Sequence, residues 1–249
     1  MTTRTTHEYD GCALSFGGGV NSVALVVLLA SEGWRGPILY AETGTEWPET
    51  DAYVAMFERE WLAPRGLSIT RLGGEWHTPS YRYSVIEYCE RHQFTPMKRA
   101  RFCTVEWKVL PIERWCKAND LDPADNLIGI AADEARRMTD KVRPLVDRHL
   151  DRNACARIIV DAGLPLPGKS ACWMCLFQSG AEWQHLYRTH PDLYERAAAL
   201  ERLASTKRGK PVLLMAANKV SLDEFAAAIE AQASWLDFAE YHVPCLCRI

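Results

Sequence analysis

Three consecutive glycines stand between a predicted strand and a predicted helix near the start of the sequence. Gly17, Gly18 and Gly19 follow the apolar residues 11–16 and precede an apolar-rich helix predicted over residues 21–29. Glycine lets backbone N–H groups approach an anion, and a helix N-terminus adds a partial positive charge of about half a unit. The turn is therefore typical of a phosphate site, with tight packing of the strand on the helix as the alternative reason for the glycines.

A second glycine-bearing turn follows the next predicted strand. Residues 37–41 are apolar, and the segment ETGTEWPET, residues 42–50, leads from them into a helix predicted over residues 48–61. Glu49 alone is explained as a favourable charge in a first helical turn. Because ligands bind outside the carboxyl ends of strands in open α/β sheets, we expect both turns to face one crevice.

Two cysteines in the second half of the sequence have the spacing of metal ligands. Cys172-x-x-Cys175 brings two thiols to one side of a tight turn, where both can reach one metal ion. A redox pair is an alternative, but the early strand and helix of a thioredoxin-like setting are missing. Two unligated core thiols are the other alternative.

The cysteine count and the N-terminus indicate the cellular compartment. The chain has nine cysteines, an odd number, and residues 1–9 are polar, with no apolar segment typical of a secretion signal. We therefore expect a cytoplasmic protein with reduced thiols and no disulfide framework.

Basic residues gather on both sides of a third cysteine. Lys98 and Arg101 precede Cys103, and Lys108 follows it. We interpret them as a clamp for phosphates or for a nucleic-acid backbone, with a solvated surface loop as the alternative.

The hydrophobic pattern predicts the elements that position these residues. Strands are predicted over residues 11–16, 37–41, 68–72 and 126–132, and helices over 21–29, 48–61, 106–118, 153–162, 181–188, 191–203 and 222–233. Alternating strands and helices indicate a doubly wound, mostly parallel α/β sheet. Asp133 and Glu134 follow the last of these strands at its ligand-binding end. The last third is mostly helical, and only residues 212–215 are a candidate for another strand.

Composition limits the domain organisation and the class of protein. The chain has 249 residues, 48% hydrophobic and 24% charged, which is typical of a folded protein. We expect an α/β domain over residues 1–150, with a helical, cysteine-bearing subdomain over residues 151–249 packed on it. The net charge of −3 argues against binding nucleic acid by bulk electrostatics. Because no apolar run approaches the roughly 20 residues of a bilayer span, we expect no membrane association.

Several motifs in one order resemble the PP-loop superfamily, and within it the phosphoadenosine phosphosulfate (PAPS) reductase family. The two turns are similar to that family's S-x-[SG]-G-G and D-T-G-x-x-x-P-E-T segments. Residues 101–112 are similar to R-x-C-x-x-x-x-K-x-x-P-[IL]. Residues 129–138 and 165–175 are similar to G-I-x-x-D-E-x-x-R-M and P-x-K-S-x-C-x-x-C, motifs of a compact phage and bacterial subgroup.

The resemblance implies an adenine nucleotide alpha hydrolase-like fold and assigns roles to individual residues. It implies contacts with the nucleotide for Ser15, Gly17, Gly18, Gly19, Asn21, Ser22, Glu42, Thr43, Gly44 and Gly129. It implies stabilisation of the charge developing at phosphorus by Lys98, Arg101 and Lys108, and a catalytic role for Asp133. It also implies a [4Fe–4S] cluster held by Cys103, Cys172, Cys175 and Cys247, with Cys245 as the competitor for the last position. Zinc is the alternative metal, since four thiolates suit both.

Three departures from the family pattern affect the expected reaction. Where ATP-cleaving members have S-G-G-x-D-S, Gly17 replaces the first serine and Asn21 replaces the aspartate. Glu42 replaces the aspartate of the second turn. The E-C-G-[LI]-H tail that supplies the catalytic thiol of sulfonucleotide reductases is absent, which makes reduction of PAPS the second hypothesis.

The resulting functional hypothesis is an adenine-nucleotide-binding, iron–sulfur-dependent sulfur transferase that activates its acceptor by adenylation. ATP, with Mg²⁺ as a candidate companion, is the expected nucleotide, and a nucleic acid or a small molecule is the expected sulfur acceptor. The alternatives are a PAPS or adenylyl sulfate reductase with Cys245 or Cys247 as nucleophile, and a non-catalytic nucleotide sensor with structural zinc. The sequence leaves a homodimer open.

Overall fold

The computed structural model describes residues 9–97, 101–137, 140–215 and 218–231. These residues form two compact units. The first contains residues 9–42, 46–82, 106–137 and 140–170, and the second contains residues 43–45, 83–97, 101–105, 171–215 and 218–231. None of the helices in the described ranges combines the length and the apolar character that a bilayer crossing requires.

The first unit is built on a four-stranded parallel sheet in the order β3-β2-β1-β4. Its strands are β1 (Leu14–Phe16), β2 (Ile38–Ala41), β3 (Ile69–Leu72) and β4 (Leu127–Ile128). Leu14 at the start of β1 pairs with Ile38 on one side and Leu127 on the other. This sheet confirms the predicted α/β class, although β4 is shorter than the strand predicted over residues 126–132.

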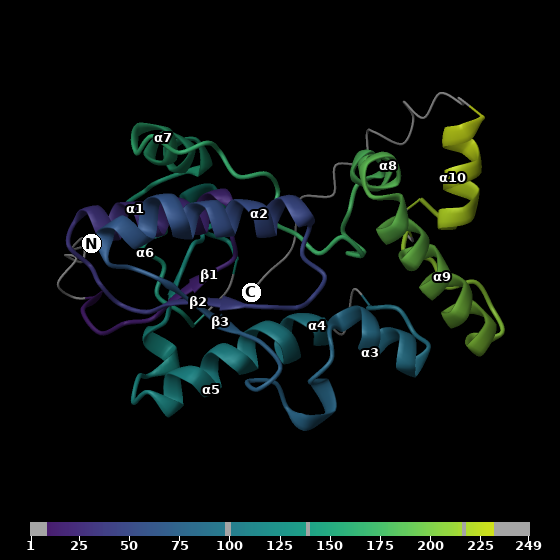
Figure 1. Ribbon diagram of the computed structural model, residues 1–249, viewed down its shortest axis with the longest axis horizontal. Helices are drawn as coiled ribbons and strands as arrows, with labels where there is room; N and C mark the ends of the chain where they lie inside the picture. The colour runs from purple at the N-terminus through teal and green to yellow at the C-terminus, as the bar shows by residue number, and fades with distance from the viewer. Residues whose placement is uncertain (1–8, 98–100, 138–139, 216–217, 232–249) are drawn as a thin grey trace. The chain divides into compact units, whose positions relative to one another are not determined.

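Helices cover both faces of this sheet (Figure 1). The first unit contains α1 (Val20–Ser31), α2 (Pro48–Phe57), α5 (Leu110–Ala118), α6 (Pro144–Asp147) and α7 (Arg152–Asp161), and α2 continues as a π-helical segment, Glu58–Leu62. Helix α1 packs against α7 on one face, and α5 contacts β2 and β3 on the other. The sheet is therefore doubly wound, as predicted.

Helix α1 lies in the core of the first unit. Val23, Ala24 and Leu25 are fully buried, and the helix is apolar on nearly all sides, as expected for one enclosed by a sheet and a second helix. The ring of Phe16, the last residue of β1, stacks on Phe57 of α2 at 5.7 Å. These contacts hold β1, α1 and α2 together on either side of the glycine turn.

Helix α7 belongs to the sheet-bearing unit. It begins at Arg152 with Asp151 as its N-cap, whose carboxylate accepts a hydrogen bond from the Ala154 N–H at 2.7 Å. The helix thus begins one residue before the segment predicted over residues 153–162. Because α7 packs on α1, the contacts place residues 151–161 with the sheet, whereas the sequence analysis divides the chain near residue 150.

The second unit is helical in its described residues. It contains α3 (Val85–His92), α4 (Phe102–Thr104), α8 (Gly180–Thr189), α9 (Pro191–Arg208) and α10 (Leu222–Glu230). Three of these helices, α3, α8 and α10, begin with a serine N-cap and a glutamate three residues later, each forming a full capping box. The helices predicted over residues 181–188, 191–203 and 222–233 correspond to α8, α9 and α10.

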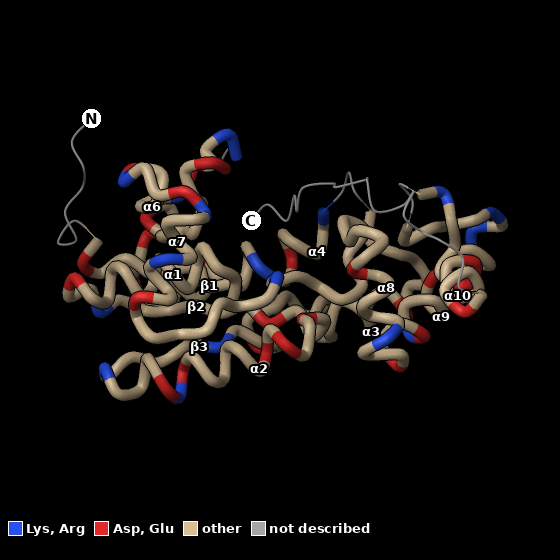
Figure 2. The backbone as a smooth tube through the Cα atoms, turned by 90° about the horizontal axis from the view of Figure 1, so that it is seen from above, with Lys and Arg blue, Asp and Glu red and all other residues tan. Residues whose placement is uncertain are grey.

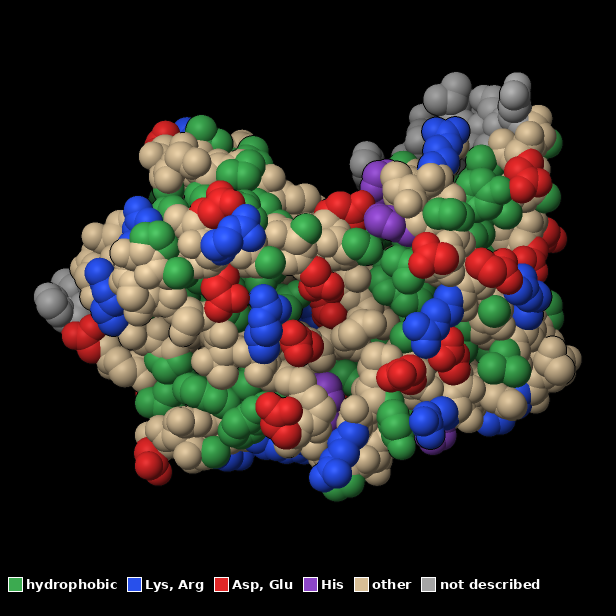
Figure 3. Space-filling view, viewed as in Figure 1, with side chains coloured by type: hydrophobic (Ala, Val, Ile, Leu, Met, Phe, Trp, Pro, Cys, Tyr) green, Lys and Arg blue, Asp and Glu red, His purple; other side chains and the backbone are tan. Residues whose placement is uncertain are grey.

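Charges of both signs are mixed on the described surface. Figure 2 shows Lys and Arg interspersed with Asp and Glu along the backbone of each unit, and Figure 3 shows the same mixing among the side chains of one face. Neither view shows a large area of one sign. This distribution fits the small net charge of −3. We therefore expect an anion to bind at a local group of donors rather than on a broad basic surface.

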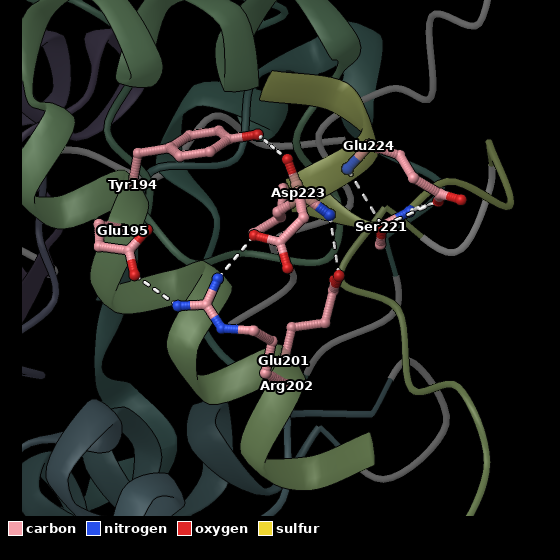
Figure 4. Close-up of polar contacts among 8 residues, drawn as sticks. Tyr194, Glu195, Glu201, Arg202, Ser221, Asp223 and Glu224 are labelled. Carbon is pink, nitrogen blue, oxygen red and sulfur yellow. Dashed lines mark hydrogen bonds and ion pairs between the residues drawn. The ribbon is translucent and has the colours of Figure 1, made fainter. Parts of the chain in front are cut away.

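Residues 212–215 do not form the strand that the sequence analysis considered. Instead, the buried carboxylate of Glu201 on α9 accepts hydrogen bonds from the Leu214 N–H at 2.6 Å and the Leu222 N–H at 2.8 Å. The exposed Arg202 next to it pairs with Glu195 and Asp223 (Figure 4). Glu201 therefore ties the loop after α9 and the start of α10 to α9, and burial raises its pKa.

Replacing Glu201 with glutamine should destabilise the second unit. The amide keeps one acceptor oxygen but turns an NH₂ group toward a backbone N–H, which costs about 1–3 kcal/mol in the free energy of unfolding. Glu195→Gln, on the same helix but exposed, is the matched control and should cost at most about 1 kcal/mol. Urea denaturation of both variants measures the difference, and equal losses would contradict the role given to Glu201.

Candidate functional site

The carboxyl ends of three strands bring predicted site residues to one edge of the sheet. Gly17 follows β1, Glu42 follows β2 and Gly129 follows β4. Because β2, β1 and β4 are parallel and adjacent in the sheet, the three positions lie along the same edge of the first unit. This is the edge where open α/β sheets bind ligands.

The three glycines of the first turn have different surroundings. Gly18 has a φ of +69°, and an added Cβ would lie 2.9 Å from Val54 and 3.1 Å from Thr50, both on α2. An added Cβ at Gly19 would collide with the hydroxyl of Ser170. At Gly17 an added Cβ would have no atom of the described structure within 4 Å. The positive φ of Gly18 and its close packing on α2 therefore favour glycine there, a side chain at Gly19 would displace the Ser170 hydroxyl, and Gly17 borders open space in the described structure.

The turn ends at an uncapped helix N-terminus. Gly19 is the N-cap of α1, no side chain accepts a hydrogen bond there, and the first turn has no acidic residue. The Gly17 N–H donates to the Ser22 hydroxyl at 3.3 Å, and this hydroxyl donates to the Gly19 carbonyl at 3.0 Å. The positive end of α1 is thus left to a ligand, and an anion such as phosphate is the favoured kind.

Gly129 supports the turn from the neighbouring strand. An added Cβ at Gly129 would lie 2.8 Å from the nitrogen and 2.9 Å from the Cα of Ser22. Only glycine allows the chain leaving β4 to approach the first turn of α1 this closely. The structure therefore places Gly129 beside the glycine turn. A direct contact between Gly129 and a nucleotide stays a prediction.

Ser15 takes part in a buried polar contact beneath the turn. Its hydroxyl accepts a hydrogen bond from the Asn126 side-chain amide at 2.6 Å, and both residues are buried. The bond connects β1 to the start of β4. In this structure Ser15 therefore helps to hold the two strands whose ends carry Gly17 and Gly129.

Asn21 contacts a carboxylate that the sequence analysis left without a role. Its side-chain Nδ2 donates to Glu134 Oε2 at 2.9 Å, and Glu134 Oε1 pairs with Arg137 at 3.3 Å. Asn21 is only 9% exposed, and its Oδ1 has no hydrogen-bond partner among the described residues. A carboxylate thus lies beside the position where ATP-cleaving relatives of the resembled superfamily have an aspartate.

Glu42 lies at the end of β2 in a charged environment. One carboxylate oxygen is 3.4 Å from the Arg71 guanidinium, which also approaches Glu58 at 3.4 Å. The Glu42 side chain is 40% exposed, so it remains accessible to a ligand. Its carboxylate can accept hydrogen bonds from the hydroxyl or amino groups of a nucleoside.

Thr43 and Gly44 belong to the second unit, and their described contacts lie there. The Thr43 carbonyl accepts a hydrogen bond from the Val85 N–H at 2.9 Å, at the start of α3. Gly44 has a φ of +68° and lies so close to Ser84 that a Cβ would meet it at 2.5 Å. Their predicted contact with a nucleoside is not tested by these contacts.

The described residues among those predicted to be catalytic are spread over both units. The Asp133 carboxylate accepts a hydrogen bond from the Arg152 N–H at 3.1 Å, at the first residue of α7. Lys108 lies in the π-helical segment Val105–Val109. The Arg101 guanidinium lies 5.0 Å from the centre of the Phe177 ring in the second unit. Lys98 lies outside the described residues. The joint role of these four residues therefore stays a prediction.

The predicted metal ligands are only partly brought together. Cys172 and Cys175 share a turn in which the Cys175 N–H donates to the Cys172 carbonyl at 3.0 Å, and the Cys172 thiol donates to the Thr45 hydroxyl at 2.9 Å. Cys103 lies near the buried Cys89, whose pKa is raised to about 12 mainly by burial and in part by Cys103.

The described ranges contain no group of three His, Cys, Asp or Glu side chains placed to hold a metal ion. Cys247 and its competitor Cys245 lie outside those ranges. The described thiols alone therefore do not fit a four-thiolate site.

His77, to which the sequence analysis assigns no role, is buried in the first unit. Burial lowers its pKa, and its ring lies 6.1 Å from Trp107 in an edge-to-face arrangement. Neither ring nitrogen forms a hydrogen bond of normal geometry in the described structure, although the Tyr81 backbone lies close enough to favour the charged form. Its place among aromatic rings is that of a core residue.

Comparisons with known proteins give a structural match without a sequence match. No protein-family model matches the chain, and no curated protein sequence matches it significantly. Among solved structures, the fold is similar to the crystal structure of a phosphoadenylyl-sulfate (PAPS) reductase from Candida auris in complex with phosphate. The two chains are 14% identical, with a TM-score of 0.49 over 68% of this chain and 89% of the other.

Proposed function

We propose that this chain is an adenine-nucleotide-binding enzyme that holds the phosphates of its ligand at the turn formed by residues 17–22. The observation that carries the proposal is the uncapped N-terminus of α1 next to Gly17, which borders open space. Backbone N–H groups and the helix dipole together bind phosphate without requiring a basic side chain. The resemblance of the two turns to PP-loop motifs supports adenine as the base.

Glu42 supplies the proposed contact with the nucleoside. It follows β2, directly beside β1, so that a ligand with phosphates at residues 17–22 extends along the sheet edge toward it. A carboxylate at the end of the second strand accepts hydrogen bonds from ribose hydroxyls in other nucleotide-binding α/β folds. The remaining exposure of Glu42 allows this contact.

The proposed reaction is adenylation of an acceptor followed by sulfur transfer. An acceptor oxygen attacks the α-phosphorus of ATP, the bond to the β-phosphate oxygen breaks, and pyrophosphate leaves. A sulfur nucleophile then displaces AMP from the activated acceptor. Within this scheme, the amides of residues 17–22 stabilise the negative charge that develops on the phosphate oxygens. The predicted contributions of Lys98, Arg101, Lys108 and Asp133 belong to the same step.

An iron–sulfur cluster would have one role in this scheme, which is to hold or supply the sulfur. Of the residues expected to bind it, Cys172 and Cys175 share one turn, and thiolates are the ligands that iron–sulfur clusters and zinc both use. The described residues do not complete its site, and the steps above therefore involve only the nucleotide and its acceptor.

Binding and product assays on the full-length protein, purified without oxygen, test the proposal. Titration calorimetry with ATP, AMP, PAPS and pyrophosphate measures binding, and pyrophosphate release with candidate nucleic-acid acceptors measures adenylation. We expect ATP to bind and pyrophosphate to form. Failure of every adenine nucleotide to bind would overturn the proposal.

The same preparation separates the two other candidate functions. Sulfite release from PAPS in the presence of thioredoxin would indicate a reductase with Cys245 or Cys247 as nucleophile. Nucleotide binding without turnover, together with zinc and no acid-labile sulfide, would indicate a sensor, which the replacement of aspartate by Asn21 favours.

A further inference from the structure

We infer that Glu134 provides the carboxylate that holds a divalent cation, Mg²⁺, on the bound nucleotide, and that Asn21 positions it. The inference rests on the proposed nucleotide site and adds the metal requirement of that site. Asn21 stands where the resembled motif has an aspartate, and in this inference the carboxylate of Glu134, 113 positions away along the chain, takes the place of that aspartate.

The first observation is the hydrogen bond between the two side chains. Asn21 Nδ2 donates to Glu134 Oε2 at 2.9 Å, and Asn21 is the second residue of α1, directly after the glycine turn. Glu134 therefore reaches the helix end where phosphate is expected. Its side chain is 31% exposed, so it remains accessible from the solvent.

The second observation is an acceptor without a donor. Asn21 is more than nine-tenths buried, and its Oδ1 has no hydrogen-bond partner among the described residues. Oδ1 belongs to the same amide group whose Nδ2 contacts Glu134. The turn thus has two oxygen-bearing side chains beside it, and oxygen is the ligand atom that Mg²⁺ prefers.

The charges indicate why a cation belongs there. A carboxylate next to a phosphate site repels the phosphate unless a positive charge lies between them. The Arg137 guanidinium lies 3.3 Å from the Glu134 carboxylate. Glu134 would hold Mg²⁺ beside the turn, and the charge of the cation would offset the repulsion between this carboxylate and a bound phosphate. Mg²⁺ bound with a nucleotide typically uses one or two protein carboxylates together with phosphate and water, so a single carboxylate such as Glu134 suffices as its protein ligand.

Glu134→Gln tests the inference through the Mg²⁺ dependence of nucleotide affinity. The variant keeps the side-chain volume and an oxygen that can accept the Asn21 hydrogen bond, but it removes the charge. We expect the affinity for ATP in Mg²⁺ to fall about tenfold or more. In EDTA, where the carboxylate only repels phosphate, we expect the affinity to stay equal or to rise. Calorimetry measures both, and Mn²⁺ electron paramagnetic resonance measures the metal directly.

Two further variants make the test specific. Glu32→Gln removes another carboxylate of the first unit that is paired with an arginine, Arg148, and should leave the ratio of the two affinities unchanged. The double variant Asn21→Asp with Glu134→Gln exchanges the amide and the carboxylate and should restore the Mg²⁺ dependence. An unchanged ratio in Glu134→Gln would overturn the inference. Absence of ATP binding in the unaltered protein would instead overturn the proposed function.

Discussion

Replacing Gly17 with aspartate should weaken nucleotide binding about 100-fold while the protein stays folded. An added Cβ at Gly17 meets no atom of the described structure within 4 Å, so the side chain fits without a clash. A carboxylate near a helix N-terminus is favourable by about 0.3–1 kcal/mol, so the variant should unfold no more easily than the original. Toward a phosphate about 5 Å away, however, the same charge costs roughly 3 kcal/mol at an effective dielectric constant near 20, or about 100-fold in affinity.

Gly17→Asn is the matched control for this variant, because it has nearly the same shape and no charge. Calorimetric titration with ATP and thermal unfolding should be measured on both. We expect asparagine to weaken binding less than aspartate does. ATP binding by Gly17→Asp with the affinity of the original protein would contradict the placement of the phosphates.

Replacing Gly129 with alanine should have the second largest effect, and here stability and binding should fall together. The new Cβ would lie 2.8–2.9 Å from the backbone of Ser22, and backbone atoms cannot rotate away as a flexible side chain can. Relieving this clash moves the end of β4 away from α1, which costs about 1–3 kcal/mol in the free energy of unfolding. Because the turn moves with α1, ATP affinity should also decrease.

Gly17→Ala provides the comparison for Gly129→Ala, since it makes the same chemical change in open space. Alanine restricts the unfolded chain more than glycine does. The free energy of unfolding of Gly17→Ala should therefore stay unchanged or rise by up to about 1 kcal/mol. Urea denaturation measures both variants. If the Gly129→Ala variant proved as stable as the Gly17→Ala variant, that result would contradict the close contact between Gly129 and the backbone of Ser22.

The sheet and the glycine turn could be predicted because their signals are local. The apolar runs around Leu14 and Ile38 and the glycines after Phe16 are contiguous in sequence, so the strand, turn and helix follow from neighbouring residues. The prediction over residues 126–132 gives strand β4 the correct position but too great a length. The pairing of β4 with β1 ends at Ile128, because the next residue, Gly129, lies against the backbone of Ser22. No pattern inside residues 126–132 reveals a contact with α1.

The contacts between distant residues could not be predicted from local patterns. In the sequence Asn21 stands only as the replacement of an aspartate, and its hydrogen bond to Glu134 joins two segments that lie 113 positions apart along the chain. Similarly, sequence order places Thr43 beside Glu42, but its described contacts are with the start of α3. The proximity of Cys103 to Cys89 also depends on how α3 and the following segment pack, which hydrophobic periodicity does not specify.

The amide resonances of residues 17–22 provide the most direct test of the central claim. Addition of ATP to ¹⁵N-labelled full-length protein should shift the backbone N–H signals of Gly17, Gly18 and Gly19 most strongly, because these groups are expected to bind the phosphates. A hollow of the first unit, about 480 Å³ and lined by residues that include Gly11, Arg35 and Gly36, lies where β1 and β2 begin, at the ends opposite the glycine turn. Shifts concentrated at Gly11 and Gly36, with none in residues 17–22, would contradict the account.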